Sequence, residues 1–142
     1  MHTLMIDWDH PTDPGPGPLR DHVRAYVATA GADGLWHGIP TLLLTTADPA
    51  TGRTVRTPLI YGRDDDRYVV LAAEGTWHAH LRAHPEVRVQ AGPAVLRATA
   101  RTATAAERDT YWEMMTALWP AYEDYRTALG TEIPLVLIDP LP

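Results

Sequence analysis

Three histidines lie close together between residues 78 and 84, where they could bind a metal ion or move a proton. His80 and His84 are four residues apart, so on a helix they would share one face, as a metal-binding pair does. A third ligand is not evident, and no metal site is predicted. A single imidazole has a pKa near neutrality, which suits a general acid or base in a pocket. His78 is the predicted catalytic histidine, and His80 is a predicted substrate contact.

Trp119, Tyr122 and Tyr125 form an aromatic stripe around Pro120. Their regular spacing would place the rings on one face of a helix or 3₁₀ turn. Such a stripe is often core packing, but rings that carry polar groups beside a kink also suit a pocket for flat organic molecules. We predict a pocket wall, in which Trp119 contacts the substrate.

These side chains need a framework, and its clearest signal is a hairpin in the first half of the chain. Two apolar runs, residues 40–46 and 56–62, flank a loop that contains Asp48, Pro49 and Gly52. Loops at the tip of a rigid sheet often contact ligands. The pattern Asp-Pro-x-Thr-Gly is also ordinary turn chemistry, so the loop is either a binding loop or a plain surface turn.

The remaining pattern predicts an α+β, mainly β, domain. A capping box from Thr104 to Glu107 marks the start of one helix, and Gly130 marks the end of another. Hairpins with helices between and after them are typical of an antiparallel barrel with helices packed outside. The predicted strands are 41–46, 55–61, 68–73, 87–91, 95–101 and 133–138, and the predicted helices are 19–29, 77–83, 104 to the break at 120, and 121–129.

Composition narrows the class of protein. A chain of 142 residues is long enough for one domain with one core. Residues 1–18 are rich in proline and glycine and are expected to form a flexible N-terminal arm, with the domain at 19–142. The net charge of -6, without a basic tract, argues against nucleic acid as a partner. The sequence has no cysteine, which excludes disulfides and leaves the redox compartment undetermined. It has no run apolar enough for a membrane span and no secretory leader pattern, so a cytoplasmic location is expected.

Four segments match a known family when they are taken together. They read Gly34-Leu-Trp-His-Gly-Ile-Pro-Thr-Leu-Leu-Leu-Thr-Thr, Thr57-Pro-Leu-Ile-Tyr-Gly, Asp66-Arg-Tyr-Val-Val and Leu81-Arg-Ala-His-Pro-Glu-Val-Arg-Val-Gln. The chain from about residue 21 to residue 140 resembles the deazaflavin-dependent nitroreductase and quinone reductase family. The resemblance implies a six-stranded split β-barrel with flanking helices. It also implies a reductase that passes hydride from a reduced deazaflavin to a quinone, an enone or a nitro compound, with Tyr122 and Tyr125 lining the substrate pocket and donating a proton.

The resemblance also implies which residues hold the coenzyme. The phosphate-binding loop of the family usually reads Gly-Arg-Lys-Ser-Gly, whereas residues 48–50 are Asp-Pro-Ala here and only the next two residues fit. Glu74 stands where the family usually has a lysine. A carboxylate repels a phosphate, so these two charge reversals predict weak coenzyme affinity. The predicted coenzyme-binding residues are Thr51, Gly52, Arg53, Arg56, Glu74 and Trp77, and Trp77 is also a predicted substrate contact.

Two other functions stay open beside the reductase. A family member that has lost its coenzyme could use the vacated cleft for cyclisation, isomerisation or ring opening of a natural-product-like substrate, with His78, His80, Glu74 and Tyr122 as candidate acid–base groups. A binding module without chemistry is the third possibility. The expected ligand of the reductase is a small planar organic molecule, and the expected partners are a small-molecule substrate and, as a homodimer, a second copy of the chain.

Overall fold

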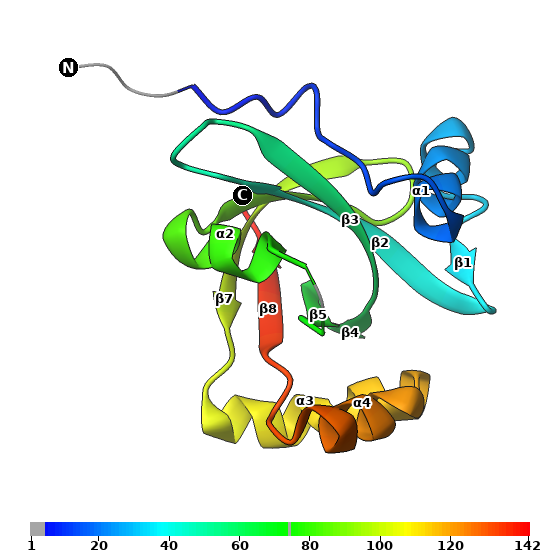
Figure 1. Cartoon of the computed structure of the whole chain (residues 1–142), viewed down its shortest axis with the longest axis vertical. Helices are drawn as coiled ribbons and strands as arrows, with labels where there is room; N and C mark the ends of the chain where they lie inside the picture. The colour runs from blue at the N-terminus through cyan, green and yellow to red at the C-terminus, as the bar shows by residue number, and fades with distance from the viewer. Residues whose placement is uncertain (1–4, 74) are drawn as a thin grey trace.

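Figure 1 shows the computed structural model of the chain, which describes residues 5–73 and 75–142. Among these residues, eight strands pair in one antiparallel sheet and four helices surround it. The strands are β1 (Leu35–Trp36), β2 (Ile39–Ala47), β3 (Thr54–Ile60), β4 (Gly62–Asp64), β5 (Arg67–Leu71), β6 (Glu86–Gln90), β7 (Val95–Thr102) and β8 (Leu135–Pro140). The helices are α1 (Pro18–Ala28), α2 (Trp77–Ala83), α3 (Ala105–Leu118) and α4 (Ala121–Leu129).

The sheet is curled, and two of its edge strands, β3 and β4, follow each other directly in the chain. The pairing order is β1-β2-β6-β7-β8-β5-β4, and β3 also pairs with β2. Only Tyr61 separates β3 from β4, so one bent stretch of chain pairs first with β2 and then with β5. The predicted α+β class, with a curled antiparallel sheet and helices outside it, is confirmed.

The predicted count of six strands is wrong. All six expected strands are present, and the structure adds the two short strands β1 and β4. β1 forms because His37 and Gly38 make a two-residue turn, with φ of 50° and 79°, that pairs Trp36 with Ile39. Positive φ at both positions is what the tight turn of a two-residue hairpin requires. β4 is a separate strand because the chain bends at Tyr61.

The four predicted helices are all present, and two have the predicted end signals. The Thr104 hydroxyl accepts a hydrogen bond from the Glu107 amide, and the Glu107 carboxylate accepts one from the Thr104 amide. Gly130 ends α4 with a φ of 67°, the left-handed conformation that favours glycine at this position. No helix among residues 5–73 and 75–142 is both long and apolar enough to cross a membrane.

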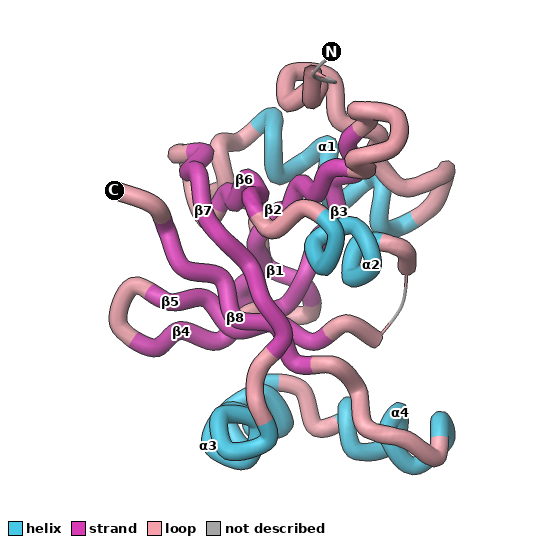
Figure 2. Tube along the Cα trace, turned by 90° about the vertical axis from the view of Figure 1, so that its left-hand side faces the viewer, coloured by secondary structure: helices cyan, strands magenta, loops and turns pink. Residues whose placement is uncertain are grey.

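Alternation along the strands divides the core into layers. On β5, Tyr68 and Val70 face the barrel interior, where Trp77 and Leu81 of α2 join them. The next residues, Val69 and Leu71, face outward and pack against α3 and α4. Figures 1 and 2 both show α3 and α4 together at one end of the sheet. On another part of the outer face, Val23 and Tyr26 of α1 pack on Leu43.

The segment before α1 runs along β3, above it in Figure 1. Its main chain bonds to the barrel at three points: the Asp7 amide to the Gly52 carbonyl, the Thr12 amide to the Thr54 carbonyl and the Arg56 amide to the Thr12 carbonyl, each at 2.8 Å. The Arg56 guanidinium also donates to both carboxylate oxygens of Asp13, at 2.6 and 2.8 Å. These contacts place residues 7–13 on the barrel, and the flexible arm over 1–18 stays a prediction.

Candidate functional site

A cavity of about 210 Å³ opens between the sheet and helices α1, α2 and α4. Aromatic rings from three separate parts of the chain line it, and most of its other lining side chains are aliphatic. Such a cavity suits a flat organic ligand, with few polar groups to orient it. The lining residues are Leu19, His22, Trp36, Thr41, Thr57, Pro58, Leu59, Ile60, Leu71, Ala73, Trp77, Trp119, Tyr122 and Tyr125.

Trp119, Tyr122 and Tyr125 all lie on one side of this cavity, which we call the α3–α4 wall. Pro120 separates the two helices because it has no amide hydrogen to continue α3. Tyr122 is 8% exposed, whereas Tyr125 is 44% exposed and lies at the rim. Burial, together with the nearby Tyr125, raises the pKa of Tyr122 to about 12. Its hydroxyl therefore keeps its proton at neutral pH and can donate it to a ligand.

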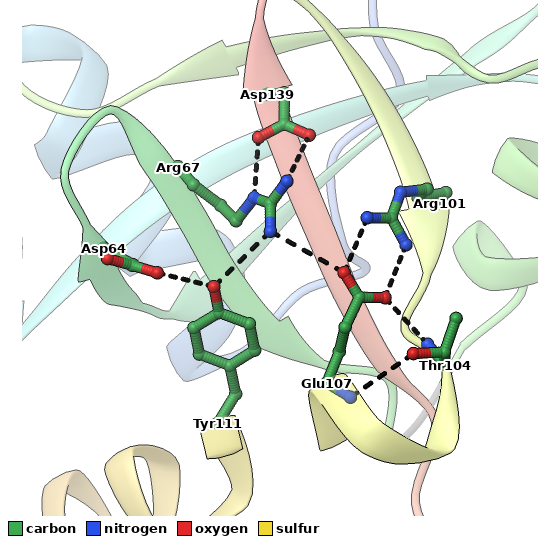
Figure 3. Close-up of polar contacts among 7 residues, drawn as sticks. All are labelled: Asp64, Arg67, Arg101, Thr104, Glu107, Tyr111 and Asp139. Atoms are coloured by element: carbon green, nitrogen blue, oxygen red, sulfur yellow. Dashed lines mark hydrogen bonds and ion pairs between the residues drawn. The ribbon is translucent and has the colours of Figure 1, made fainter. Parts of the chain in front are cut away.

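A network of charged groups fixes the first turns of α3 on the barrel (Figure 3). Arg67 of β5 donates to both carboxylate oxygens of Asp139, at 2.8 and 3.2 Å, and to the Tyr111 hydroxyl at 3.4 Å. Tyr111 in turn donates to Asp64 at 2.5 Å. Glu107 accepts two hydrogen bonds of 2.7 Å from Arg101, which lower its pKa to about 2. Four strands thus hold the helix from which the α3–α4 wall extends.

A second group of contacts joins α3 to α4. The Trp112 indole donates to the Glu123 carboxylate at 2.8 Å, and Arg126 donates to the other oxygen of that carboxylate at 2.6 Å. The guanidinium groups of Arg108 and Arg126 lie over the Trp112 ring, 5.1 and 4.7 Å from its centre. The two helices are therefore linked directly behind the rings that face the cavity.

A second group of lining residues, which we call the α1–β1 wall, consists of Leu19, His22 and Trp36 with Thr41 beside them. The Nε2 atom of His22 is 2.7 Å from Oγ1 of Thr41, and the Thr41 hydroxyl donates to the Gly34 carbonyl at 2.6 Å. Burial lowers the pKa of His22, and the charge of Asp33 opposes this in part.

Sequence reasoning missed the α1–β1 wall. One signal was available, because His22 lies four residues before Tyr26, on the face of α1 that is buried. A titratable residue on the apolar face of a helix marks either a satisfied core position or a site. Trp36 carried no such signal, since its place depends on a strand of two residues.

Aromatic contacts connect the two walls at one end of the cavity. The ring centres are 5.4 Å apart for His22 and Trp36, 5.0 Å for Trp36 and His37, and 5.9 Å for His37 and Trp119. The β1–β2 turn thereby packs against the break between α3 and α4, which lies far along the chain.

The predicted site residues of α2 take different positions, and not all of them line the cavity. Trp77 is buried and lines the cavity. His78 does not line it, because its Nε2 atom is 2.8 Å from Oγ1 of Thr102 on β7. His80 does not line it either, and its Nδ1 atom is buried without a hydrogen-bond partner in the described part of the chain. Within the same residues, no group of three or more histidines and carboxylates is arranged to hold a metal ion.

In the loop between β2 and β3, main-chain amides and the Thr51 hydroxyl donate their hydrogen bonds to other atoms of the same loop. The Asp48 carboxylate accepts from the Ala50 amide at 2.9 Å and from the Thr51 hydroxyl at 3.2 Å. The amides of Thr51 and Gly52 donate to the Asp48 carbonyl, and the Arg53 amide donates to the Thr51 hydroxyl. Thr51, Gly52 and Arg53, three of the predicted coenzyme contacts, lie in this loop and do not line the cavity. The Arg53 side chain is exposed.

The other predicted coenzyme contacts lie elsewhere. Arg56 is paired with Asp13, on the side of the barrel where residues 7–13 run. Trp77 is the predicted coenzyme contact that lines the cavity. Glu74 lies outside the described residues.

Comparison with known proteins identifies the family of the chain. A family model described as F420H(2)-dependent quinone reductase matches residues 18–140. An F420H(2)-dependent quinone reductase of Mycobacterium tuberculosis is 30% identical over 133 residues, which cover 84% of this chain and 88% of that protein.

Two solved structures have a similar fold. A structure described as an F420-H2 dependent reductase has a TM-score of 0.67 and 28% identity, over 70% of this chain and 94% of that chain. Another, described as a domain-swapped dimer, has a TM-score of 0.65 and 27% identity, over 84% and 98% of the two chains. The family match runs from α1 to the end of β8, and the predicted deazaflavin-dependent oxidoreductase is confirmed at the level of the family. The chain therefore belongs to the F420H(2)-dependent quinone reductase family.

Proposed function

We propose that the chain binds a reduced deazaflavin and reduces a small planar electrophile, such as a quinone or an enone, in the cavity. One observation carries this proposal: Trp77, Trp119 and Tyr122 come from different elements and line one narrow apolar space. Flat rings stack well in such a space. When bound, the coenzyme supplies hydride to the electrophilic carbon of the substrate.

The described residues fit such a coenzyme in one respect, because the aromatic and aliphatic lining suits its flat ring system. Oγ1 of Thr46 and Nδ1 of His80 are buried and have no partner within residues 5–73 and 75–142, but neither residue lines the cavity.

Tyr122 is the proposed proton donor. Its hydroxyl stays protonated because burial raises its pKa to about 12, so it can donate a hydrogen bond to the substrate oxygen where negative charge develops. Tyr125 is the more exposed of the two tyrosines, and we assign it a contact at the rim of the cavity. His78 has no place in this scheme, because its hydrogen bond to Thr102 points it to β7.

The anionic tail of the coenzyme needs a cation, and Arg53 is the proposed one. The amides of the loop are bonded within the loop, so a side chain must make the contact. Arg53 is exposed at the end of the loop, whereas Arg56 is paired with Asp13. A partly exposed ion contact of this kind contributes on the order of 1 kcal/mol or less, so the grip on the tail is expected to be weak.

A homodimer is a further part of the proposal. The relative described as a domain-swapped dimer supports it, since that chain is covered almost completely by the match. Sedimentation or light scattering of the purified chain will give its oligomeric state. The cytoplasmic location stays a prediction from the sequence.

The test is an absorbance assay with purified protein, reduced deazaflavin and a naphthoquinone. Oxidised coenzyme should accumulate only when protein and quinone are both present. Titration of the coenzyme should show weaker binding to Arg53→Ala than to the wild type, by about fivefold at low salt, with a smaller change for Arg56→Ala. A protein that binds the coenzyme but reduces no quinone, enone or nitro compound would contradict the proposal.

A further inference from the structure

We propose that His22 selects substrates that carry a hydroxyl group, by accepting a hydrogen bond from that hydroxyl at its Nδ1 atom. The inference rests on the proposed function, and it names the substrate class of the same cavity: hydroxylated quinones and related hydroxylated ring systems. The argument depends on which nitrogen of His22 carries the proton.

A chain of two hydrogen bonds determines the tautomer of His22. The Gly34 carbonyl oxygen can only accept a hydrogen bond, and it lies 2.6 Å from Oγ1 of Thr41. The single hydroxyl hydrogen of Thr41 must therefore point at Gly34. Oγ1 of Thr41 is left as an acceptor toward His22, 2.7 Å away, so Nε2 of His22 must carry a hydrogen and donate it.

With Nε2 donating to Thr41, the other nitrogen of a neutral His22 is an acceptor. His22 lines the cavity, and Nδ1 is the one polar atom that its ring has left to present there. Among the described residues, the one hydrogen bond of the His22 ring is at Nε2. Burial keeps the ring neutral at neutral pH by lowering its pKa.

Neighbouring rings hold the imidazole in this orientation. Trp36 meets it edge to face at 5.4 Å and 85°, and Tyr26 meets it at 6.2 Å and 63°. A 180° flip of the ring about the Cβ–Cγ bond would keep the ring plane but lose the hydrogen bond between Nε2 and Oγ1 of Thr41. The acceptor is therefore held in a fixed place, as selection between similar ligands requires.

The chemistry of the two walls is complementary. On the α3–α4 wall, Tyr122 has a hydroxyl that donates to a substrate carbonyl. On the α1–β1 wall, His22 offers a neutral acceptor, which a carbonyl oxygen cannot use and a hydroxyl hydrogen can. A ligand with a carbonyl at one end and a hydroxyl at the other satisfies both walls, whereas a methyl ether leaves His22 without a partner.

The experiment measures binding without the coenzyme. Two naphthoquinones of nearly the same shape are compared, one with a phenolic hydroxyl on the ring remote from its carbonyls and the other with a methyl ether there. Quenching of tryptophan fluorescence reports binding, since Trp36, Trp77 and Trp119 line the cavity. The wild type is expected to bind the hydroxylated compound about threefold to tenfold more tightly, the value of one neutral hydrogen bond.

Two variants separate selection from a structural role. In His22→Asn the amide lies near the position of Nδ1 and does not reach Thr41, so part of the preference should remain. In His22→Gln the amide reaches Thr41 and leaves the position of Nδ1 empty, so the preference should disappear. The reverse order, with the preference kept in His22→Gln and lost in His22→Asn, would mean that His22 only supports Thr41, and would overturn the inference.

Binding of the two naphthoquinones to the wild type alone also tests the inference. Equal binding of the two naphthoquinones would overturn the inference and leave the proposed function standing. Binding of neither compound would overturn the proposed function and the inference together.

Discussion

The α3–α4 wall and the α1–β1 wall of the cavity are held by different kinds of interaction. The α3–α4 wall rests on ionised groups: Arg67 joins α3 to the barrel, and Trp112 lies against two arginines behind the cavity. The α1–β1 wall rests on neutral groups: His22, Thr41 and Gly34 form one chain of hydrogen bonds, and the remaining contacts are between ring edges.

This difference matches the two tasks that we assign to the walls. Charge-assisted hydrogen bonds are shorter and about twice as strong as neutral ones, so they hold the proton donor Tyr122 in a rigid position. The neutral chain on the α1–β1 wall holds His22, the proposed acceptor, in one orientation. The protein thus holds its proposed proton donor with ionised groups and its proposed acceptor with neutral ones.

The largest expected effect is on the stability of the α3–α4 wall. Trp112→Ala should destabilise the fold by about 3–5 kcal/mol, because it removes a buried ring and leaves Glu123 without its indole donor. Urea unfolding followed by circular dichroism measures this cost. Trp36→Ala, on the α1–β1 wall, should cost clearly less because Trp36 is only half-buried. Equal costs would show that the two walls do not differ as described.

A second effect separates the chemistry of the α3–α4 wall from its packing. Tyr122→Phe should lower kcat about a hundredfold, the usual size of a lost general acid, and leave stability within about 1 kcal/mol. Steady-state kinetics and a thermal melt on the same sample test both parts. Tyr125→Phe is the matched control at the rim, where a smaller loss is expected. Unchanged kcat in Tyr122→Phe would mean that the ring is packing and another group supplies the proton.

A third effect tests the neutral hydrogen bonds of the α1–β1 wall, which run from His22 through Thr41 to Gly34. Thr41→Val keeps the shape of the side chain but leaves Nε2 of His22 without its partner and removes the shorter of the two bonds to the Gly34 carbonyl, which keeps the 3.2 Å bond from the Thr41 amide; the loss should cost about 1–3 kcal/mol. Thr57→Val, at another threonine of the same cavity, is the control and should cost less. Chemical denaturation of both variants decides the point, and similar costs would argue against a specific role for the chain of bonds.

The smallest effect concerns the acid stability of the α3–α4 wall. Hydrogen bonds from Arg101 depress the pKa of Glu107 to about 2 in the folded protein. The stabilisation is therefore complete above the ordinary glutamate range and is lost as pH falls from about 4.5 toward 2. Thermal melts between pH 5 and pH 2 should decline less steeply for Glu107→Gln than for the wild type. Glu113→Gln, on the exposed side of α3, should leave the slope unchanged, and a decline of equal slope in all three proteins would exclude Glu107 as a source.

Much of the fold could be predicted because its signals are local. Apolar runs bounded by turn residues gave the six main strands, and Thr104 and Gly130 gave helix ends, since each signal lies within a few residues of the feature it marks. The aromatic stripe was found for the same reason, because Pro120 and the spacing of the rings belong to one short segment. β1 was missed because a strand of two residues has no periodicity to detect.

The candidate site could be predicted only in part, since most of it depends on contacts between segments that are distant in sequence. His78 and Trp77 are neighbours in sequence, yet Trp77 lines the cavity and His78 bonds to Thr102. The charge pattern of the loop after β2 indicated a weak grip on an anion, but it did not show that Asp48 would take up the donors of the loop itself.

By itself the sequence determined the four helices, the six longer strands, their order and the aromatic stripe, because short-range sterics, capping and side-chain periodicity act between near neighbours. The tertiary structure alone decided that His22 meets Thr41 and that the turn at His37 meets Trp119. Those contacts exist because α1 packs on Leu43 at the outer face of β2 while α3 is fixed to four strands by ion pairs and hydrogen bonds. Packing and electrostatic complementarity between segments far apart in sequence leave no local pattern from which such a meeting can be predicted.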